Sequence, residues 1–238
     1  MKIYANRGSS GTHPENTLPA FQAAAELQVD GVVISVQLSK DGEIVVINDE
    51  KLERTTNGQG YVRDFTLDEL KELDCGSWFS AEWAGETIPT LDEVLDVFKE
   101  TTHRLNIELK TDVFPEDRLL DKVIALADKK EMADRLLLSS FNHEDIQKAA
   151  HNTSVESAII TMNVLVDVYD YARIVGTNRI HLSLPSAFRR MATDALRKGA
   201  IVYAYTVNDL QYAEELQHIG IHGIITNYPE LMVEKFSK

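Results

Sequence analysis

The sequence predicts one α/β domain, a (β/α)8 barrel with a small insertion after its second strand. Three observations lead to this fold class. The 238 residues match the length of a single barrel of this type, and a hydrophobic content of 44% is enough for a substantial core. Short β-rich runs alternate with helix-period stretches along the chain, which predicts a parallel sheet. We therefore expect one domain over residues 1–238, with the insertion at residues 49–90.

The expected strands are short runs rich in aliphatic and β-branched residues, and there are about eight of them. They lie at residues 2–5, 32–36, 105–109, 135–139, 157–161, 179–182, 201–205 and 223–226. The helix-period stretches between them include residues 17–27, 91–98, 118–130, 187–198 and 210–219. Strand–helix units in this number, at this chain length, close most naturally into a TIM barrel.

Residues 49–88 break the alternation of strands and helices. They contain an Asn-Gly turn dipeptide, a capping pattern that begins at Thr66, and two tryptophans, Trp78 and Trp83, where a simple crossover helix is expected. The pattern leaves two alternatives open. The insertion is either a lid over the barrel mouth or a packed excursion from the barrel.

Composition argues against several classes of partner. The chain has 24 Lys and Arg residues against 38 Asp and Glu residues, a formal net charge of −14 at pH 7. We therefore expect no nucleic-acid partner and no anionic lipid surface. No run approaches the roughly 20 apolar residues that a membrane span needs, and the first residues lack a signal-peptide pattern. The single Cys75 suits a reducing compartment, so we expect a cytoplasmic protein with an inert thiol. The oligomeric state stays open.

Charged residues follow the expected strands at the end where barrels of this type carry their functional groups. That rule brings Arg7, Glu108 and Lys110 to one mouth. The planar donor fork of arginine and the mobile charge of lysine both suit a phosphate, and a carboxylate between them can hold a metal or orient the cations. The residues therefore predict an oxyanion site. Solvated charges or structural ion pairs are the alternative.

Motifs along nearly the whole chain resemble the glycerophosphodiester phosphodiesterase family. The Asn-Arg-Gly of residues 6–8, followed by the Pro-Glu-Asn-Thr of residues 14–17, is similar to the family's H-R-G…P-E-N-T opening. The Lys-Asp-Gly of residues 40–42, the Asn-Ile-Glu-Leu-Lys of residues 106–110 and the Thr-Asn-Tyr-Pro of residues 226–229 resemble later family motifs in the same order.

The resemblance implies a metal-dependent phosphoric diester hydrolase, usually with Ca²⁺ or Mg²⁺, that cleaves glycerophosphodiesters into glycerol 3-phosphate and an alcohol. In the implied mechanism two histidines act as general acid and base, because proton transfer to the leaving alkoxide needs a group that titrates near neutral pH. Carboxylates hold the cation, and arginine and lysine neutralise the phosphate.

This chain departs from the family at the positions that carry the chemistry. Both catalytic histidine positions fall on asparagine, Asn6 and Asn48, whose amides cannot exchange protons near neutral pH. Losing one positioned acid or base typically costs on the order of 10²–10⁴ in rate. Of the three main metal carboxylates only Glu108 remains, because the other two positions fall on Val33 and Ser35. We therefore expect weak or absent binding of the family cation, and no other cofactor.

Other family positions are retained. The resemblance assigns Arg7, Glu15 and Lys110 to binding of the phosphate-containing substrate, and it places Tyr205 where the family has a tryptophan. Tyr205 is either a stacking wall for the ligand or an ordinary packing residue. The alternative for the charged groups is that Arg7 and Lys110 pair with Glu15 and Glu108 as structural bridges.

Three functions remain open. The first is a catalytically impaired or inactive family member that binds a small phosphate ligand or glycerophosphodiester, and the loss of acid, base and metal positions beside retained cations favours it. The second is an active phosphodiesterase with an altered site, in which His13 or His181 replaces a lost histidine. The third is a structural or protein-interaction role, with Trp78 and Trp83 as the contact surface.

Overall fold

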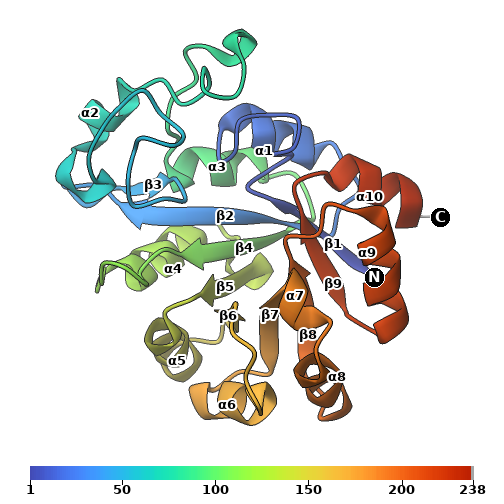
Figure 1. Ribbon diagram of the computed structural model, residues 1–238. Helices are drawn as coiled ribbons and strands as arrows, with labels where there is room; N and C mark the ends of the chain where they lie inside the picture. The colour runs from blue at the N-terminus through green and yellow to red at the C-terminus, as the bar shows by residue number, and fades with distance from the viewer. Residues whose placement is uncertain (237–238) are drawn as a thin grey trace.

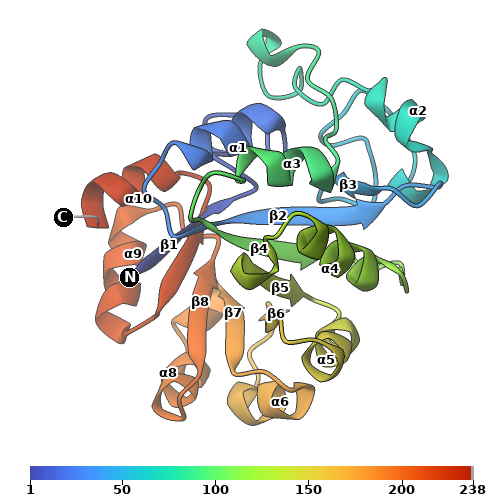
Figure 2. The ribbon, with the colours of Figure 1, turned by 180° about the vertical axis from the view of Figure 1, so that it is seen from behind.

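A computed structural model describes residues 1–236 and shows a closed barrel of parallel strands surrounded by helices (Figure 1; Figure 2). The sheet order is β1-β9-β8-β7-β6-β5-β4-β2, and pairing of β1 with β2 closes the ring. The barrel strands are β1 (Lys2–Asn6), β2 (Gly31–Leu38), β4 (Arg104–Leu109), β5 (Leu136–Ser140), β6 (Glu156–Thr161), β7 (Arg179–Ser183), β8 (Ile201–Tyr205) and β9 (Gly223–Thr226). The predicted fold class is confirmed.

The helices lie on the outside of the barrel and bury their apolar faces against it (Figure 1). They are α1 (Leu18–Ala25), α3 (Leu91–Val97), α4 (Leu119–Lys129), α5 (His143–Asn152), α6 (Val168–Val175), α7 (Leu184–Ala187), α8 (Arg190–Arg197), α9 (Leu210–Ile219) and α10 (Pro229–Phe236). Side-chain caps begin several of them, as at Thr17, whose hydroxyl accepts from the backbone of Ala20. Within residues 1–236, no helix has both the length and the apolarity to cross a membrane.

One helix prediction was wrong in its bounds. The sequence pattern predicted a single helix over residues 187–198, whereas the structure has α7 ending at Ala187 and α8 beginning at Arg190. Arg189 between them has an extended backbone, with φ −92° and ψ 159°, which interrupts the helical hydrogen bonds. The apolar spacing continues across this break, so hydrophobic periodicity alone could not locate it.

Large aromatic side chains fill the barrel interior below the mouth. Tyr4 of β1 and Tyr203 of β8 are buried, and their ring centroids are 5.2 Å apart in an edge-to-face arrangement. Glycines on neighbouring strands leave room for them, because a Cβ at Gly31 would lie 2.6 Å from the Tyr4 ring and one at Gly223 would lie 2.8 Å from the Tyr203 ring. The interior is therefore a packed core and not a channel.

An ionic group closes the end of the barrel opposite the mouth. Arg104 at the start of β4 and Arg179 at the start of β7 both donate to the carboxylate of Glu156 at the start of β6. Burial raises the pKa of Glu156, but the two guanidinium groups outweigh this effect and leave the pKa below its usual range. The three side chains lie under the aromatic layer.

The segment after β2 first forms a hairpin, because β3 (Ile44–Val46) pairs antiparallel with β2. It then continues through α2 (Leu67–Lys71) and two short 3₁₀ turns, and it extends beyond the carboxyl end of β2 (Figure 1). This segment has a small apolar core of its own, formed by Val45, Ile47, Leu52, Val62, Leu70, Cys75 and Ile88. The thiol of Cys75 is buried there, and burial raises its pKa to about 12.

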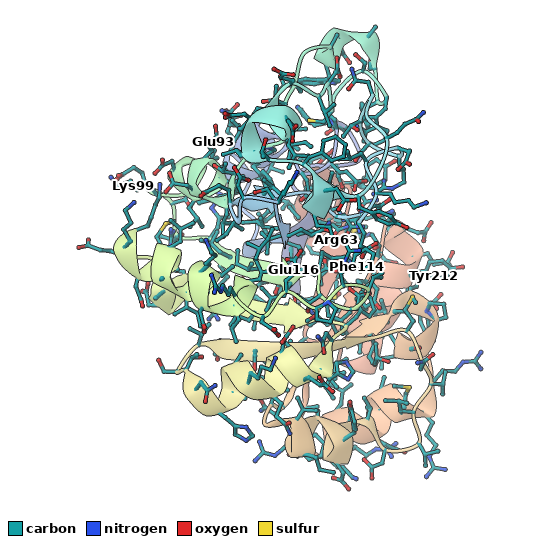
Figure 3. The ribbon with its side chains drawn as sticks, turned by 90° about the vertical axis from the view of Figure 1, so that its left-hand side faces the viewer. Arg63, Glu93, Lys99, Phe114, Glu116 and Tyr212 are labelled. Carbon is teal, nitrogen blue, oxygen red and sulfur yellow. The ribbon has the colours of Figure 1, made fainter. Side chains whose placement is uncertain are left out.

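Contacts hold this segment against the loops of the mouth. Phe114 lies in the loop after β4, and its ring centroid is 3.6 Å from Cζ of Arg63. Figure 3 shows the two side chains side by side. The segment also contacts the loop after β1, because the ring centroids of Trp83 and His13 are 4.9 Å apart. Trp78 donates from Nε1 to the carbonyl oxygen of Cys75 at 2.9 Å and remains 39% exposed. The segment is therefore packed beside the mouth.

Candidate functional site

A cavity of about 350 Å³ opens at the carboxyl ends of the barrel strands. Its lining has three parts. Charged groups lie at or just after the carboxyl ends of β1 and β4, and apolar groups come from β2, β5, β6, β8 and β9 or the residues that follow them. Neutral polar side chains complete the lining, including the two asparagines that the resemblance places at the family's histidine positions. The volume and the mixed lining are typical of a site for a small molecule.

Arg7 is held at the end of β1 by the backbone around it. Its φ of 58° places it in the left-handed region, which is uncommon for a residue with a side chain. The backbone N–H of Arg7 donates to the carbonyl of Val33 at 3.0 Å, and its carbonyl accepts from the N–H of Asn16 at 3.0 Å. These two bonds fix the direction in which the guanidinium leaves the strand.

Glu15 lies behind Arg7 and outside the lining of this cavity. It accepts from Nη1 of Arg7 at 2.7 Å and from both terminal nitrogens of Arg54 at 2.8 Å. Arg54 also donates to Asp49, at 2.5 Å and 2.8 Å. Burial raises the pKa of Glu15, but Arg54 and Arg7 outweigh it and hold the pKa below its usual range. The geometry therefore gives Glu15 a positioning contact with Arg7, and none with the cavity.

Lys110 lies between two carboxylates at the end of β4. Its Nζ is 3.8 Å from Oε1 of Glu108 and 3.5 Å from Oδ1 of Asp112. The other carboxylate oxygen of Glu108 accepts from the hydroxyl of Ser35 at 3.4 Å. Lys110, Glu108 and Ser35 are all buried. Neither contact of the ammonium is a close hydrogen bond, so it can still donate to a ligand.

Both ion pairs that the sequence left as an alternative are present, Arg7 with Glu15 and Lys110 with Glu108. The two cations nevertheless line the cavity, together with the carboxylates of Glu108 and Asp112. Formal charge on the lining is therefore balanced. An anion that enters must compete with these carboxylates for the two cations, which limits the affinity that charge alone provides.

Asn6 and Asn48, which the resemblance places at the family's histidine positions, both line the cavity. Nδ2 of Asn6 donates to Oδ1 of Asn227 at 2.9 Å, and Nδ2 of Asn48 donates to Oδ1 of Asp49 at 2.7 Å. Gln37 supports the second position from below by donating to the carbonyl of Asn48 at 3.2 Å. The two amides are thus fixed by neighbours at the places where acid and base would lie, but they do not titrate.

The donor set at the positions that the resemblance assigns to metal binding does not fit a hard divalent cation. Val33 lines the cavity with an aliphatic side chain, and the hydroxyl of Ser35 is directed to Glu108. The ammonium of Lys110 lies 3.8 Å from the one remaining carboxylate. A hard cation needs six or so oxygen ligands, several of them charged. Across residues 1–236, no group of three or more His, Cys, Asp or Glu side chains is arranged to hold a metal.

Tyr205 is one of the apolar groups that line the cavity. Its ring lies edge-on to Phe141, with centroids 6.1 Å apart, and Ile160 and Met162 are further apolar groups of the lining. Burial, and secondarily the charge of Glu108, raise the pKa of the Tyr205 hydroxyl. That hydroxyl has no hydrogen-bond partner in the part of the chain that the structure describes. The position is compatible with the stacking role that the sequence left open.

The two replacement histidines considered from the sequence lie in different places. His181 of β7 lines the deep part of the cavity and is stacked on Tyr203, with centroids 5.5 Å apart. Burial lowers the pKa of His181 to about 3. His13 lies outside the cavity lining, next to Trp83 and Thr12.

The polar lining residues Asn106 and Asp112 were not nominated by sequence reasoning. A signal for the first was available. Side chains two apart on a strand point to the same face, so Asn106 faces the interior whenever Glu108 does. For Asp112, which lies in a loop beyond β4, strand alternation gives no direction.

Comparison with known proteins agrees with the sequence motifs. The model of the Glycerophosphoryl diester phosphodiesterase family matches residues 7–231. A curated glycerophosphodiester phosphodiesterase of Caldanaerobacter subterraneus subsp. tengcongensis is 35% identical over 239 residues, which cover 99% of this chain and 98% of that protein.

Solved structures show the same similarity. A phosphodiesterase of Oleispira antarctica, in complex with the product sn-glycerol-3-phosphate, is 30% identical with a TM-score of 0.88, and the match covers 100% of this chain and 97% of that one. A glycerophosphodiester phosphodiesterase of Thermotoga maritima is 27% identical with a TM-score of 0.79, covering 98% and 97% of the two chains.

Proposed function

We propose a function from one premise, that the chain belongs to the glycerophosphoryl diester phosphodiesterase family. The protein binds a small phosphate-containing ligand of the glycerophosphodiester type at the barrel mouth, with hydrolysis lost or severely impaired. One observation carries this proposal. The cavity keeps Arg7 and Lys110 on its lining, beside Asn6, Asn48 and Val33, which stand where the resemblance expects acid, base and metal ligand.

Binding follows from the donors that remain available. Glu15 accepts a hydrogen bond from one nitrogen of Arg7, Nη1, so the rest of the guanidinium can donate to phosphate oxygens. Lys110 keeps its carboxylate neighbours at 3.5 Å and 3.8 Å, beyond close hydrogen-bond distance, and can reorient toward an anion. A phosphate that accepts from both cations would make the charge-assisted bonds that are the strong ones in such sites.

Loss of turnover follows from proton transfer. Cleavage of a phosphate ester requires removal of a proton from the attacking group and delivery of a proton to the leaving alkoxide. The amides of Asn6 and Asn48 can do neither. His181 cannot deliver a proton near neutral pH, because burial lowers its pKa to about 3. Each lost acid or base costs on the order of 10²–10⁴ in rate.

The similarity to the Oleispira antarctica phosphodiesterase supports the choice of first ligand. That protein was solved with the product sn-glycerol-3-phosphate, and its fold matches this chain over its full length. The retained cations Arg7 and Lys110 offer the same chemistry to a phosphate monoester or diester. We therefore choose sn-glycerol 3-phosphate and glycerophosphocholine as probes.

Isothermal titration calorimetry with these two probes tests the proposal. We expect saturable binding at millimolar or lower ligand concentration, and a loss of about tenfold or more in Lys110→Met, since a charge-assisted bond is worth more than 1.4 kcal/mol. Lys235→Met, which removes an exposed lysine paired with Glu214, is the matched control and should bind like wild type. A folded wild-type protein that binds neither probe at millimolar concentration would overturn the proposal.

A second candidate is an active phosphodiesterase with an altered site. The names of the curated relatives and the retained Glu108 favour it. Release of glycerol 3-phosphate from glycerophosphocholine with Ca²⁺, Mg²⁺ or Mn²⁺ separates the two candidates. Activity that co-purifies with wild type and disappears in Lys110→Met would establish the second, while activity equal in both preparations comes from a contaminant.

For the location of the protein, the chemistry of Cys75 supports the cytoplasm. It is the single cysteine of the sequence, so the chain has no internal disulfide to form, which suits a reducing compartment. Cell fractionation with an antibody against the chain tests this location, and recovery outside the cytoplasmic fraction would contradict it.

A further inference from the structure

Three buried polar side chains form the floor of the cavity, below Arg7 and Lys110. Asn106 of β4, Ser139 of β5 and His181 of β7 all line the cavity, and they are 1%, 0% and 2% exposed. Both polar atoms of the Asn106 amide, the hydroxyl of Ser139 and Nδ1 of His181 have no hydrogen-bond partner among residues 1–236. The three side chains come from different strands, so the barrel itself brings them together.

Unpaired polar groups at such burial are costly. A buried donor or acceptor without a partner has lost its bonds to water and gained none, and most buried polar groups in proteins do have a partner. Three side chains with this deficit on one floor indicate that the partner is a molecule in the cavity. The cavity volume of about 350 Å³ is large enough for a small organic ligand.

Register explains why Asn106 lacks a partner in this chain. In the pairing of β2 with β4, Asn106 lies opposite Val33, whose aliphatic side chain cannot accept or donate a hydrogen bond. The resemblance to the family places a carboxylate at position 33, which could have accepted from the amide. With valine there, the hydrogen-bonding capacity of Asn106 is available to the cavity.

The chemistry of the floor favours neutral hydroxyl groups. An amide, a hydroxyl and a neutral imidazole each offer both a donor and an acceptor. His181 is neutral because its burial lowers the pKa to about 3. A carboxylate or second phosphate would meet acceptor atoms as well as donors, whereas a hydroxyl can pair with both. Val33 and Ile225, which also line the cavity, can pack against the carbon atoms between hydroxyls.

We propose that Asn106, Ser139 and His181 recognise the hydroxyl groups of a polyol, such as the glycerol unit of a glycerophosphate, by direct hydrogen bonds without a metal ion. The inference rests on the proposed function, because it places the phosphate of the same ligand against Arg7 and Lys110. The floor then selects the polyol, and the two cations select the phosphate. This division assigns different parts of one ligand to different residues.

A comparison of three ligands on the wild-type protein tests the division. Inorganic phosphate, propyl phosphate and sn-glycerol 3-phosphate present the same charged group, and only the last carries two hydroxyls. We expect the affinity for sn-glycerol 3-phosphate to be at least about tenfold higher than that for propyl phosphate, because propyl phosphate lacks the hydroxyls that make one or two of the hydrogen bonds. Equal affinity for these two ligands would overturn the floor proposal and leave the phosphate site standing.

Variants of the floor give a second readout. Ser139→Ala and Asn106→Leu should lower the affinity for sn-glycerol 3-phosphate by about fivefold or more and change that for inorganic phosphate by less than about twofold. Ser154→Ala, at an exposed serine outside the cavity, is the matched control. Floor variants that bind both ligands like wild type would overturn the floor proposal. A wild-type protein that binds none of the three ligands overturns both proposals.

Discussion

Val33 of β2 lies opposite Asn106 of β4 in the barrel register, and the Asn106 amide has no hydrogen-bond partner in the described chain. A carboxylate at position 33, which the resemblance to the family implies, would stand next to this amide and on the same face as Glu108. Replacement by valine therefore changes two properties of the mouth together. It removes a ligand for a cation, and it leaves an amide available to whatever occupies the cavity.

Restoring the two missing carboxylates should restore cation binding. We expect Val33→Glu with Ser35→Asp to bind Ca²⁺ or Mg²⁺ at millimolar or lower concentration, because three carboxylates then surround one position. Calorimetric titration of the metal alone measures this. Asn6→His with Asn48→His, which adds no carboxylate, is the control and should bind like wild type. Wild-type protein that binds the cation as tightly as the carboxylate variant would contradict the expectation.

Hydrolysis should require all four restorations together. We expect the variant with Asn6→His, Asn48→His, Val33→Glu and Ser35→Asp to release glycerol 3-phosphate from glycerophosphocholine at least about 10² times faster than wild type, since both acid and base return. The rate should depend on added cation and vary with pH near the histidine pKa of about 6.5. A folded, cation-binding variant that hydrolyses no faster than wild type would show that another part of the mouth is missing.

Glu15→Gln should destabilise the protein by about 2 kcal/mol, because two guanidinium groups lose a charged partner. The pKa of Glu15 is lowered in the folded state, so its contribution is present above the usual carboxyl range and is lost as pH falls through that range toward the folded pKa. Urea unfolding of wild type and variant at about pH 7 and about pH 4 measures both effects. The difference in free energy of unfolding should shrink at the lower pH.

Glu214→Gln provides the comparison for this experiment, because Glu214 pairs with Lys235 on the surface. Exposed pairs of this kind contribute about 0–1 kcal/mol. Equal losses of stability in the two variants would mean that the contacts of Glu15 with Arg7 and Arg54 stabilise the fold no more than an exposed ion pair does.

Glu116 should make the protein less stable as pH rises toward neutrality. It lies beside Arg63 and Phe114 (Figure 3) and accepts from the backbone N–H of Leu38 at 2.9 Å. Burial raises its pKa to about 7, so its stabilising contribution is present below the ordinary value of 4.5 and is lost as pH rises through about 7. Glu116→Gln should therefore raise the Tm relative to wild type at about pH 8, with little difference at about pH 4.

Thermal unfolding at several pH values measures this dependence. Asp117→Asn removes a carboxylate from the exposed neighbouring residue and should keep the pH dependence of wild type. A Glu116→Gln variant whose Tm follows the wild-type pH profile would contradict the assignment to Glu116.

The barrel was predictable because its strands carry a local pattern. A strand such as β8, predicted at residues 201–205 and observed as Ile201–Tyr205, is a continuous apolar run between turn signals. The break between α7 and α8 was not predictable, because the apolar spacing runs through it. Local patterns therefore give the elements, and contacts between elements decide their ends.

The candidate site was also predictable only in part. Arg7 and Lys110 were found from the rule that functional groups follow barrel strands. The link from Glu15 to Arg54 joins residues 39 positions apart in the sequence, and no local pattern indicates it. Glu15 was therefore assigned to ligand binding by resemblance, whereas the geometry places it behind Arg7. Contacts of this kind, behind the residues that line the cavity, can be identified only from the packed structure.

The aromatic pair of Tyr4 and Tyr203 has a consequence for any occupant of the barrel. With the ions of Arg104 and Glu156 below it, this layer makes the cavity a blind pocket, so molecules must enter and leave by the same opening. The end of a ligand that enters first must then leave last. A polyol seated on the floor would leave the substituent on its phosphate directed to solvent, where a small alcohol and a bulky one have equal room.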